Sequence, residues 1–284
     1  MRNSETSGFD DRNHGGNDGS DDAMTGQALE LGIEGDIATI TFCRPEVRNA
    51  IGETLIADLE QALDRVERLE TLRALIITGA GNCFMAGGDI AMMRAGLERP
   101  YEFFLLHDRI TRIGMRLERL RIPVIAAING YAFGGGLELA LACDFRIMAE
   151  GAKLGLPEVG LGIMPGSGGT ARLVRVVGRE QAFYLELTGQ PVNAREAHRI
   201  GLAGQVVPDD RVLQAARELA GQIAARAPIA VTFIKRAVTL AADMPLEGAV
   251  DYCQYAALFL SVTQDCREGF AAFLEKRPPQ WRGR

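Results

Sequence analysis

Three consecutive glycines, Gly134 to Gly136, open an apolar stretch inside the run NGYAFGGGLELALACD, which spans Asn129 to Asp144. The run follows IPVIAAI (Ile122 to Ile128), a short segment rich in β-branched residues that predicts a buried strand. Asn129 and Gly130 break this strand, and LELALA after the glycines favours a helix. The chain is therefore expected to pass from a buried strand through bare backbone into a helix, as α/β folds do.

The glycine turn offers unusual access to the backbone. Glycine has no Cβ, so a ligand can approach its N–H closely. The first N–H groups of a helix have no internal partner and lie at the positive end of its dipole, which suits an oxyanion. Glu138 follows Gly135 by three residues and shares its helix face. Two interpretations fit: an anion site beside an acid or base, or glycines that allow tight packing with Glu138 complementing the dipole.

A second glycine site precedes the first. RALIITGAG (Arg73 to Gly81) predicts a strand and turn, and CFMAGGDIAMM (Cys83 to Met93) places Gly87 and Gly88 before a helical pattern. Two such sites, each supplying one N–H, would hold one developing negative oxygen. A single donor of this type contributes roughly 2.7–4 kcal/mol to acyl-transfer catalysis. Asp89 is expected to be an N-terminal helix charge rather than a catalytic base.

A third segment, KLGLPEVGLGIMPGSGGTARL (Lys153 to Leu173), carries another carboxylate. Pro157 and Pro165 bracket a loop that contains Glu158, and GSGGTARL predicts a further helix. A carboxylate held beside apolar residues has its pKa raised by desolvation, as a general acid at neutral pH requires. The alternative is a solvated loop glutamate.

Together these segments resemble the enoyl-CoA hydratase/isomerase, or crotonase, superfamily in its hydratase branch. The resemblance runs from about Ala28 to the C-terminus and includes RPEVRNAI (Arg44 to Ile51) and EGFAAFLEKRPPQW (Glu268 to Trp281). The combination of motifs is specific, whereas any single glycine run is not. The resemblance implies an α/β fold, a crotonase-like spiral of ββα units with a C-terminal helical trimerisation region.

The resemblance also implies roles for single residues. The N–H groups of Gly88 and Gly135 correspond to an oxyanion hole for the thioester carbonyl, and Glu138 and Glu158 to paired catalytic carboxylates. Both glutamates are present, whereas isomerases and other branches often lack one. Met85 and Gly88 stand where alanine is common. The residues expected to bind the acyl-CoA substrate are Ala86, Gly87, Gly88, Asp89, Ile90 and Gly135.

The implied reaction adds water across the 2,3 double bond of a 2-enoyl-CoA thioester to give a 3-hydroxyacyl-CoA, so the enzyme is expected to be a hydro-lyase. Glu138 is assigned chiefly to the water and Glu158 chiefly to Cα, although close carboxylates share their protons. No metal or other cofactor is expected, because coenzyme A is part of the substrate. The alternative is an enoyl-CoA isomerase, or a dehydratase or hydratase of a specialised thioester of the carnitinyl-CoA or cyclic acyl-CoA type.

Three other functions fit less well. GSGGTA (Gly166 to Ala171) matches GxGxxA, but the preceding LGIMP is a poor strand, so a dinucleotide site lacks its context. A hydrolase is disfavoured because Pro165 occupies the position where a GxSxG elbow needs glycine, and His107 and His198 are expected on helices as surface or packing residues. A non-catalytic RNA-binding or scaffold protein of the same fold is disfavoured by the retained glutamates and the charge distribution.

Composition supports one main domain with extensions. The chain has 284 residues, 47% of them hydrophobic, and no apolar stretch long enough to cross a bilayer. Its five cysteines are widely spaced, which fits a reducing compartment, and a cytoplasmic location is expected. The acidic tail contributes −4 of the net charge of −6, so the rest is nearly neutral and no nucleic-acid or membrane partner is expected.

We expect three regions along the chain. Residues 1–27 form a disordered acidic tail, within which Met24 is a candidate for the true start. Residues 28–208 form the crotonase core, for acyl-CoA binding and catalysis. Residues 209–284 are helical, and the resemblance implies that they close the active site and assemble a homotrimer or a hexamer of two trimers.

Overall fold

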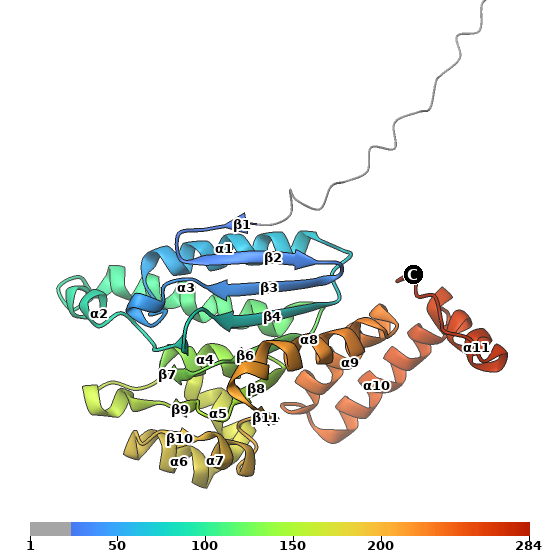
Figure 1. Ribbon diagram of the computed structural model, residues 1–284. Coiled ribbons are helices and arrows are strands. Elements are labelled where there is room, and N and C mark those ends of the chain that lie inside the picture. The colour runs from blue at the N-terminus through green and yellow to red at the C-terminus, as the bar shows by residue number, and fades with distance from the viewer. Residues whose placement is uncertain (1–23) are drawn as a thin grey trace, which may run out of the picture.

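The computed structural model describes residues 24–284, and two β-sheets form its framework (Figure 1). The larger sheet has the order β1-β2-β3-β4-β6-β8-β11, antiparallel from β1 to β3 and parallel from β3 onward. The smaller sheet has the order β10-β9-β7-β5, with β9, β7 and β5 parallel. The strands of the larger sheet are β1 (Met24–Thr25), β2 (Leu29–Glu34), β3 (Ile37–Phe42), β4 (Ala74–Gly79), β6 (Val124–Ile128), β8 (Phe145–Ala149) and β11 (Gln205–Val207). Those of the smaller sheet are β5 (Cys83–Met85), β7 (Tyr131–Phe133), β9 (Lys153–Gly155) and β10 (Val192–Asn193).

Helices follow and cover the strands. The α-helices are α1 (Glu53–Arg68), α2 (Ile90–Gly96), α3 (Pro100–Arg119), α4 (Gly135–Leu141), α5 (Gly169–Val177), α6 (Arg179–Thr188), α7 (Ala194–Arg199), α8 (Val212–Ala224), α9 (Pro228–Ala241), α10 (Leu246–Ser261) and α11 (Gln264–Glu275). The short 3-10 helices are η1 (Pro45–Val47), η2 (Pro157–Leu161) and η3 (Asp209–Arg211).

The expected spiral of ββα units is confirmed by the strand order. Strand β4 is followed along the chain by β5, β6 by β7 and β8 by β9, and each of these pairs leads into a helix. The first members, β4, β6 and β8, are neighbours in the larger sheet, and the second members, β5, β7 and β9, are neighbours in the smaller one. Each turn of the chain therefore repeats the path of the one before it, one strand further along both sheets.

The central strands explain why this framework is rigid. Every residue of β4 and β6 is buried, because both strands are covered on both faces, as the continuous apolar runs ALIITG and VIAAI predict. Helix α1 buries its apolar stripe, which includes Leu55, Leu59 and Leu63. Strands β4 and β6 thus hold the turns at their carboxyl ends in fixed positions.

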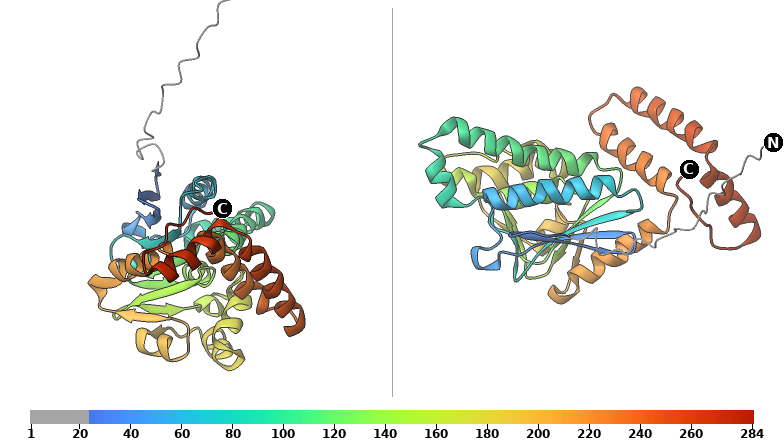
Figure 2. Two further views of the ribbon diagram at one scale, coloured as in Figure 1. Left: turned by 90° about the vertical axis from the view of Figure 1, so that its right-hand side faces the viewer. Right: turned by 90° about the horizontal axis from the view of Figure 1, so that it is seen from above.

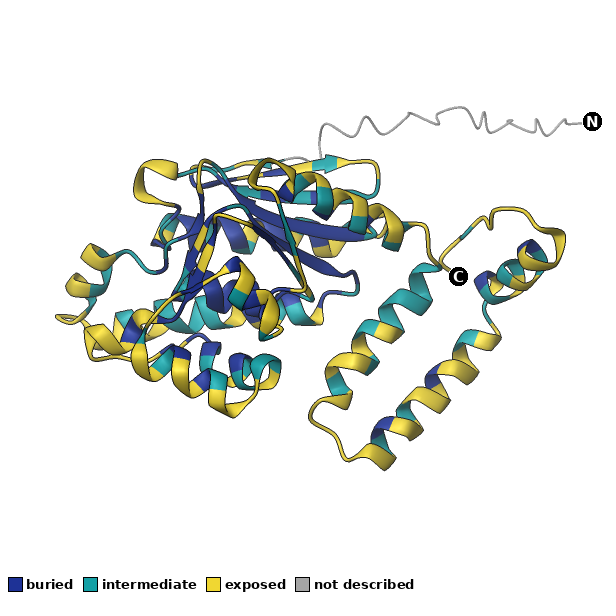
Figure 3. Ribbon diagram, turned by 60° about the horizontal axis from the view of Figure 1, so that its bottom comes forward, coloured by how far each residue is buried: buried dark blue, intermediate teal, exposed yellow. Residues whose placement is uncertain are grey.

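The C-terminal part is helical from η3 onward, as expected, but α8 packs against β4, β6 and β8. Its residues Val212, Ala216 and Ala220 belong to the same hydrophobic core as the sheets. Helix α9 stays in contact with the body, where Thr232 donates to the carbonyl of Arg121 and Lys235 pairs with Asp144 at 2.8 Å. Helices α10 and α11 extend away from the body (Figure 2) and carry much exposed surface (Figure 3). No helix within residues 24–284 is long and apolar enough to cross a membrane.

The predicted boundary of the disordered tail at residue 27 is wrong, because strand β1 already begins at residue 24. Strand β1 pairs with β2 through Met24 opposite Leu31 and Thr25 opposite Glu30. The N–H of Gly26 donates to the carbonyl of Leu29, so the segment is fixed from residue 24 onward. Residues 1–23, which make up the remainder of the expected tail, lie outside the described residues.

Candidate active site

The two glycine segments meet because they follow neighbouring parallel strands. Strands β5 and β7 pair in parallel, so their carboxyl ends open at one edge of the smaller sheet. Gly87 and Gly134 both have positive φ, at 98° and 52°, a region that side chains other than glycine avoid. A Cβ on Gly134 would lie 3.7 Å from the Cα of Gly87. The bare backbone therefore lets the two segments come into contact.

Each segment has a main-chain N–H at the cavity that donates to no acceptor in the described residues, that of Gly88 and that of Gly135. Ile51 forms a parallel bridge with Gly88, in which it donates to the carbonyl of Gly87 and accepts from the N–H of Asp89. These two bonds use the carbonyl of Gly87 and the N–H of Asp89, on either side of Gly88, and leave the N–H of Gly88 itself free. Gly135 is the first residue of α4, where the helix supplies no acceptor. Within residues 24–284, neither N–H donates to a protein acceptor.

Glu138 is buried and firmly held. Its side chain is 5% exposed, and its Oε1 accepts hydrogen bonds from the N–H groups of Ser167, at 2.7 Å, and Gly169, at 2.8 Å. Burial raises the pKa of Glu138, while these two N–H groups and the charges of His107 and Arg172 act in the opposite direction. The hydrogen bonds therefore favour the ionised carboxylate in a site that otherwise disfavours it.

Glu158 is also buried but less well satisfied. It is 9% exposed and lies on η2, a helical turn rather than the open loop that the sequence allowed. Its Oε2 is shielded from solvent and has no hydrogen-bond partner. Burial, followed by the charges of Glu138 and Glu186, raises the pKa of Glu158 to about 7, with only its own main-chain N–H acting to lower it. The solvated-glutamate interpretation is therefore wrong.

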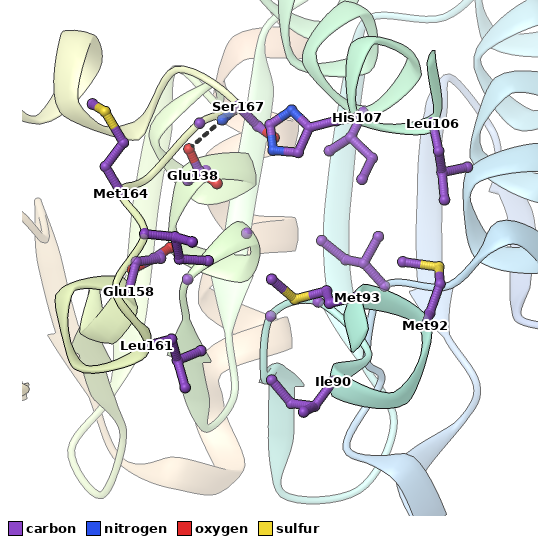
Figure 4. A pocket seen from close by; sticks show the side chains of 18 of the residues that line it. Ile90, Met92, Met93, Leu106, His107, Glu138, Glu158, Leu161, Met164 and Ser167 are labelled. Carbon is purple, nitrogen blue, oxygen red and sulfur yellow. Dashed lines mark hydrogen bonds between the residues drawn. The ribbon is translucent and has the colours of Figure 1, made fainter. Parts of the chain in front are cut away.

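One cavity of about 150 Å³ contains all of these groups. Figure 4 shows Glu138 and Glu158 on one side of the cavity, with Met92, Met93 and Leu106 on the opposite side. Its mouth is apolar, since Ile90 and Leu161 are each 60% exposed. The cavity is lined by Ile51, Ala86, Gly87, Gly88, Ile90, Met92, Met93, Phe103, Leu106, His107, Ile110, Gly134, Gly135, Glu138, Pro157, Glu158, Leu161, Ile163, Met164, Gly166 and Ser167.

Most of the residues predicted for substrate binding lie on this cavity, and one does not. Ala86, Gly87, Gly88, Ile90 and Gly135 line it. Asp89 instead caps helix α2, where its Oδ1 accepts from the N–H of Met92 at 3.0 Å. That geometry matches its predicted role as a helix charge and removes it from the cavity wall.

The sequence did not indicate three further residues at the site. The N–H groups of Ser167 and Gly169 fix Glu138 from a loop about 30 residues away, which no local pattern reveals. His107, expected to be a surface or packing residue, lies on α3 against the cavity, with its Nε2 3.5 Å from Ser167 Oγ (Figure 4). Its position on the inward face of a helix next to Leu106 and Ile110 was the available signal.

Residues 24–284 hold no group of side chains suited to a metal ion. In the part of the chain that it describes, no three His, Cys, Asp or Glu residues come together as metal ligands would. That the reaction uses neither a metal nor another cofactor stays a prediction.

Comparison with known proteins gives one consistent result. A protein-family model described as enoyl-CoA hydratase/isomerase matches residues 32–284. The chain is 39% identical to the short-chain-enoyl-CoA hydratase of Clostridium acetobutylicum, over 86% of this chain and 93% of that protein. It is 41% identical to the crotonyl-CoA hydratase of Syntrophomonas wolfei, over 89% of this chain and 97% of that protein. The crystal structure of enoyl-CoA hydratase from Bacillus anthracis superposes with a TM-score of 0.87 at 38% identity, covering 91% of this chain and 100% of that one.

Proposed function

Because the chain belongs to the enoyl-CoA hydratase/isomerase family, we propose that its cavity adds water across the 2,3 double bond of a 2-enoyl-CoA thioester. The activity is enoyl-CoA hydration, which makes the enzyme a hydro-lyase. One observation supports the assignment of residues: two free N–H groups and two buried glutamates line the same cavity. Four groups with the chemistry that hydration needs thus lie within reach of one small acyl group.

The N–H groups of Gly88 and Gly135 act on the thioester oxygen. As water attacks Cβ, electron density moves from the double bond onto that oxygen and an enolate-like species forms. Two donors that are already free of protein acceptors stabilise this charge without rearrangement. Because these donors strengthen their bonds as charge develops, they lower the barrier rather than merely bind the substrate.

The two carboxylates divide the proton transfers. Glu138 is held as an anion by Ser167 and Gly169, so it takes the proton from water as the Cβ–O bond forms. Glu158, whose surroundings raise its pKa to about 7 so that it can carry a proton near neutral pH, delivers a proton to Cα. The surroundings of the two groups support the division that the sequence predicted. No further cofactor is required, because the coenzyme A thioester already activates the double bond.

Hydration of crotonyl-CoA, followed by loss of the absorbance of the conjugated enone, tests the proposal. We expect Glu138→Gln and Glu158→Gln each to lower kcat by roughly 10²–10⁴-fold, because each loses one acid or base, with little change in binding of the CoA ester. Glu150→Gln, in an exposed turn, is the matched control and should keep wild-type activity. Near-normal hydration by either active-site variant would remove that residue from the mechanism.

An isomerase or a hydratase of a specialised thioester is the second candidate. The cavity keeps both carboxylates, which hydration uses together, and this favours hydration over isomerisation. The same assay separates them: an enzyme that is inactive with crotonyl-CoA but dehydrates a branched or cyclic 3-hydroxyacyl-CoA would support the specialised substrate.

Assembly into a homotrimer, or a hexamer of two trimers, belongs to the same proposal. Helices α10 and α11 leave large apolar side chains in solvent, among them Tyr255 at 70%, Phe270 at 69% and Phe273 at 82% exposed. Surfaces of this kind are typical of subunit contacts. Sedimentation equilibrium would give three or six times the mass of one chain, and a monomer at all concentrations would contradict the proposal. A cytoplasmic location is proposed as well, supported by five cysteines of which none is in a disulfide.

A further inference from the structure

Two carboxylates, those of Glu158 and Glu186, each have a buried oxygen that no group within residues 24–284 satisfies. In the described part of the chain, three buried side-chain polar atoms lack a hydrogen-bond partner: Glu158 Oε2, Glu186 Oε1 and Tyr252 Oη. A buried acceptor without a partner destabilises a fold by about 1–3 kcal/mol. Glu158 has a place in the proposed mechanism, whereas Glu186 does not line the cavity and has no assigned role.

Glu186 lies next to the segment that carries Glu158 and to the segment that holds Glu138. Its helix, α6, packs against η2, which carries Glu158. One turn further along α6, a Cβ on Gly189 would lie 3.2 Å from Cγ1 of Val159, next to Glu158. The other oxygen of Glu186, Oε2, accepts from Oγ1 of Thr170 at 2.8 Å. Thr170 follows Gly169, which donates to Glu138, so Glu186 is held between the segments that position both carboxylates.

The charges around the pair are distributed unevenly. The charges that act to lower the pKa of Glu138 come from two basic residues, His107 on α3 and Arg172 on α5. The charges that act on the pKa of Glu158 come from two acidic residues, Glu138 on α4 and Glu186 on α6. These two acidic charges raise the pKa of Glu158 beyond the effect of its burial. Of the two, only Glu186 does not line the cavity.

We propose that Glu186 is a positioning residue that keeps the transferable proton on Glu158. This inference rests on the proposed hydration. In each turnover Glu138 gains a proton from water and Glu158 loses one to Cα, so a proton must pass from Glu138 back to Glu158 before the next cycle. A fixed negative charge behind Glu158 makes that return favourable, because it stabilises the protonated form of its neighbour. Glu186 does not line the cavity, so it acts only through Glu158.

The pH dependence of hydration tests this role. Glu158 must be protonated, so kcat/KM falls as the pH rises through its pKa. Glu186→Gln removes the charge but keeps an oxygen that accepts from Thr170, so the fold is retained. We expect the alkaline limb of kcat/KM to move to lower pH by roughly one unit, which is a loss of about tenfold above the limb. Glu186→Asp keeps the charge and should leave the limb near its wild-type position.

Glu180→Gln is the matched control, since it removes a negative charge from the exposed start of the same helix. It should not move the limb, because solvent screens that charge. If Glu186→Gln lowers the rate equally at every pH, or only lowers the melting temperature, Glu186 is a structural residue and the proposal is wrong.

A second measurement separates this proposal from the function on which it rests. In protein labelled with ¹³C at the glutamate carboxyl groups, infrared or NMR titration follows Glu158 directly, with Glu158→Gln identifying its signal. The free protein should show a pKa of about 7 for Glu158, and a lower value in Glu186→Gln. That lower value supports the role of Glu186 even if no enoyl-CoA is hydrated, whereas an unchanged value overturns it whatever the substrate.

Discussion

Glu138 and Glu158 are the same residue type in adjacent buried positions, yet the two regions that hold them favour opposite protonation states. The region of α4 and α5 gives Glu138 two main-chain N–H donors and basic neighbours. The region of η2 and α6 gives Glu158 an unpartnered oxygen and acidic neighbours. Burial alone would treat both alike, so the difference comes from hydrogen bonds and charge. The segments packed against the two glutamates therefore determine which of them acts as the acid and which as the base.

The two regions also differ in how closely the backbone approaches each carboxylate. A Cβ on Gly169 would lie 2.8 Å from Cγ of Glu138, and one on Gly134 would lie 3.1 Å from Oε1 of Glu158. Gly169 is in addition a donor to Glu138. The held carboxylate is thus the one that a change in its surroundings displaces most.

Among changes to the surroundings of the two carboxylates, the largest expected effect comes from Gly169→Ala. The added methyl group overlaps Glu138 and also lies 2.9 Å from Cβ of Pro165, so the carboxylate and its donor must separate. A displacement of about 1 Å in a catalytic group lowers kcat by roughly 10²-fold. Steady-state kinetics with crotonyl-CoA measure this loss.

Gly160→Ala provides the comparison on the other side. Gly160 is an exposed residue of η2, and a Cβ there would have no atom within 4 Å. It should keep activity close to the wild type. Equal losses in the two variants would show that the two carboxylates tolerate backbone change alike, against the contrast drawn above.

Sequence patterns predicted the long elements of this fold but not the smaller sheet. The buried runs of β4 and β6 and the apolar stripe of α1 are strong periodic or continuous signals. Strands β5, β7 and β9 have three residues each, too few for any period. They are strands only because they pair with one another, and that pairing depends on the spiral as a whole.

The site likewise combines residues that sequence motifs predicted with contacts that they did not. Gly88, Gly135, Glu138 and Glu158 belong to motifs that are visible in the sequence. The donors from Ser167 and Gly169, and the charge of Glu186, reach the site through packing of α5 and α6 against α4 and η2. Residue types at single positions were therefore predictable, whereas the surroundings that set their protonation were not.

A smaller effect is expected in stability, and it separates the two carboxylates without any substrate. The pKa of Glu158 is raised from 4.5 to about 7 in the folded protein, so the folded state binds more protons than the unfolded state between these values. The contribution of Glu158 to wild-type stability therefore falls as the pH rises from 5 to 8. Glu158→Gln cannot ionise, so its stability relative to the wild type should increase by roughly 2 kcal/mol across this range. Urea unfolding at pH 5 and pH 8 measures the difference.

Glu138→Gln is the counterpart in that experiment. Its oxygen is already stabilised by two N–H donors, so replacing the carboxylate removes a favourable charged acceptor along with the penalty of burial. The gain between pH 5 and pH 8 should be smaller than for Glu158→Gln. A larger gain at position 138 would mean that the two regions have been assigned the wrong way round.

The smallest expected effect comes from changing Arg172, which holds the loop that donates to Glu138. Arg172 on α5 donates to the carbonyl of Ser167 at 2.9 Å and forms a two-point ion pair with Glu118 at 2.7 and 2.9 Å. Arg172→Met removes both contacts and a positive charge that lowers the pKa of Glu138. We expect kcat to fall by roughly tenfold, the equivalent of about 1.4 kcal/mol, through a looser Ser167 donor.

The pH profile of the same variant identifies the cause. Glu138 must be ionised to accept a proton from water, so activity is lost as the pH falls through its pKa, and a higher pKa moves this acidic limb to higher pH. Arg175→Met, on the exposed side of α5 where Arg175 pairs with Asp243 at 2.9 Å, should leave the limb in place. A limb that stays fixed or moves to lower pH in Arg172→Met would show that the basic charge beside Glu138 does not set its protonation, and the contrast with Glu158 would then depend on the hydrogen bonds alone.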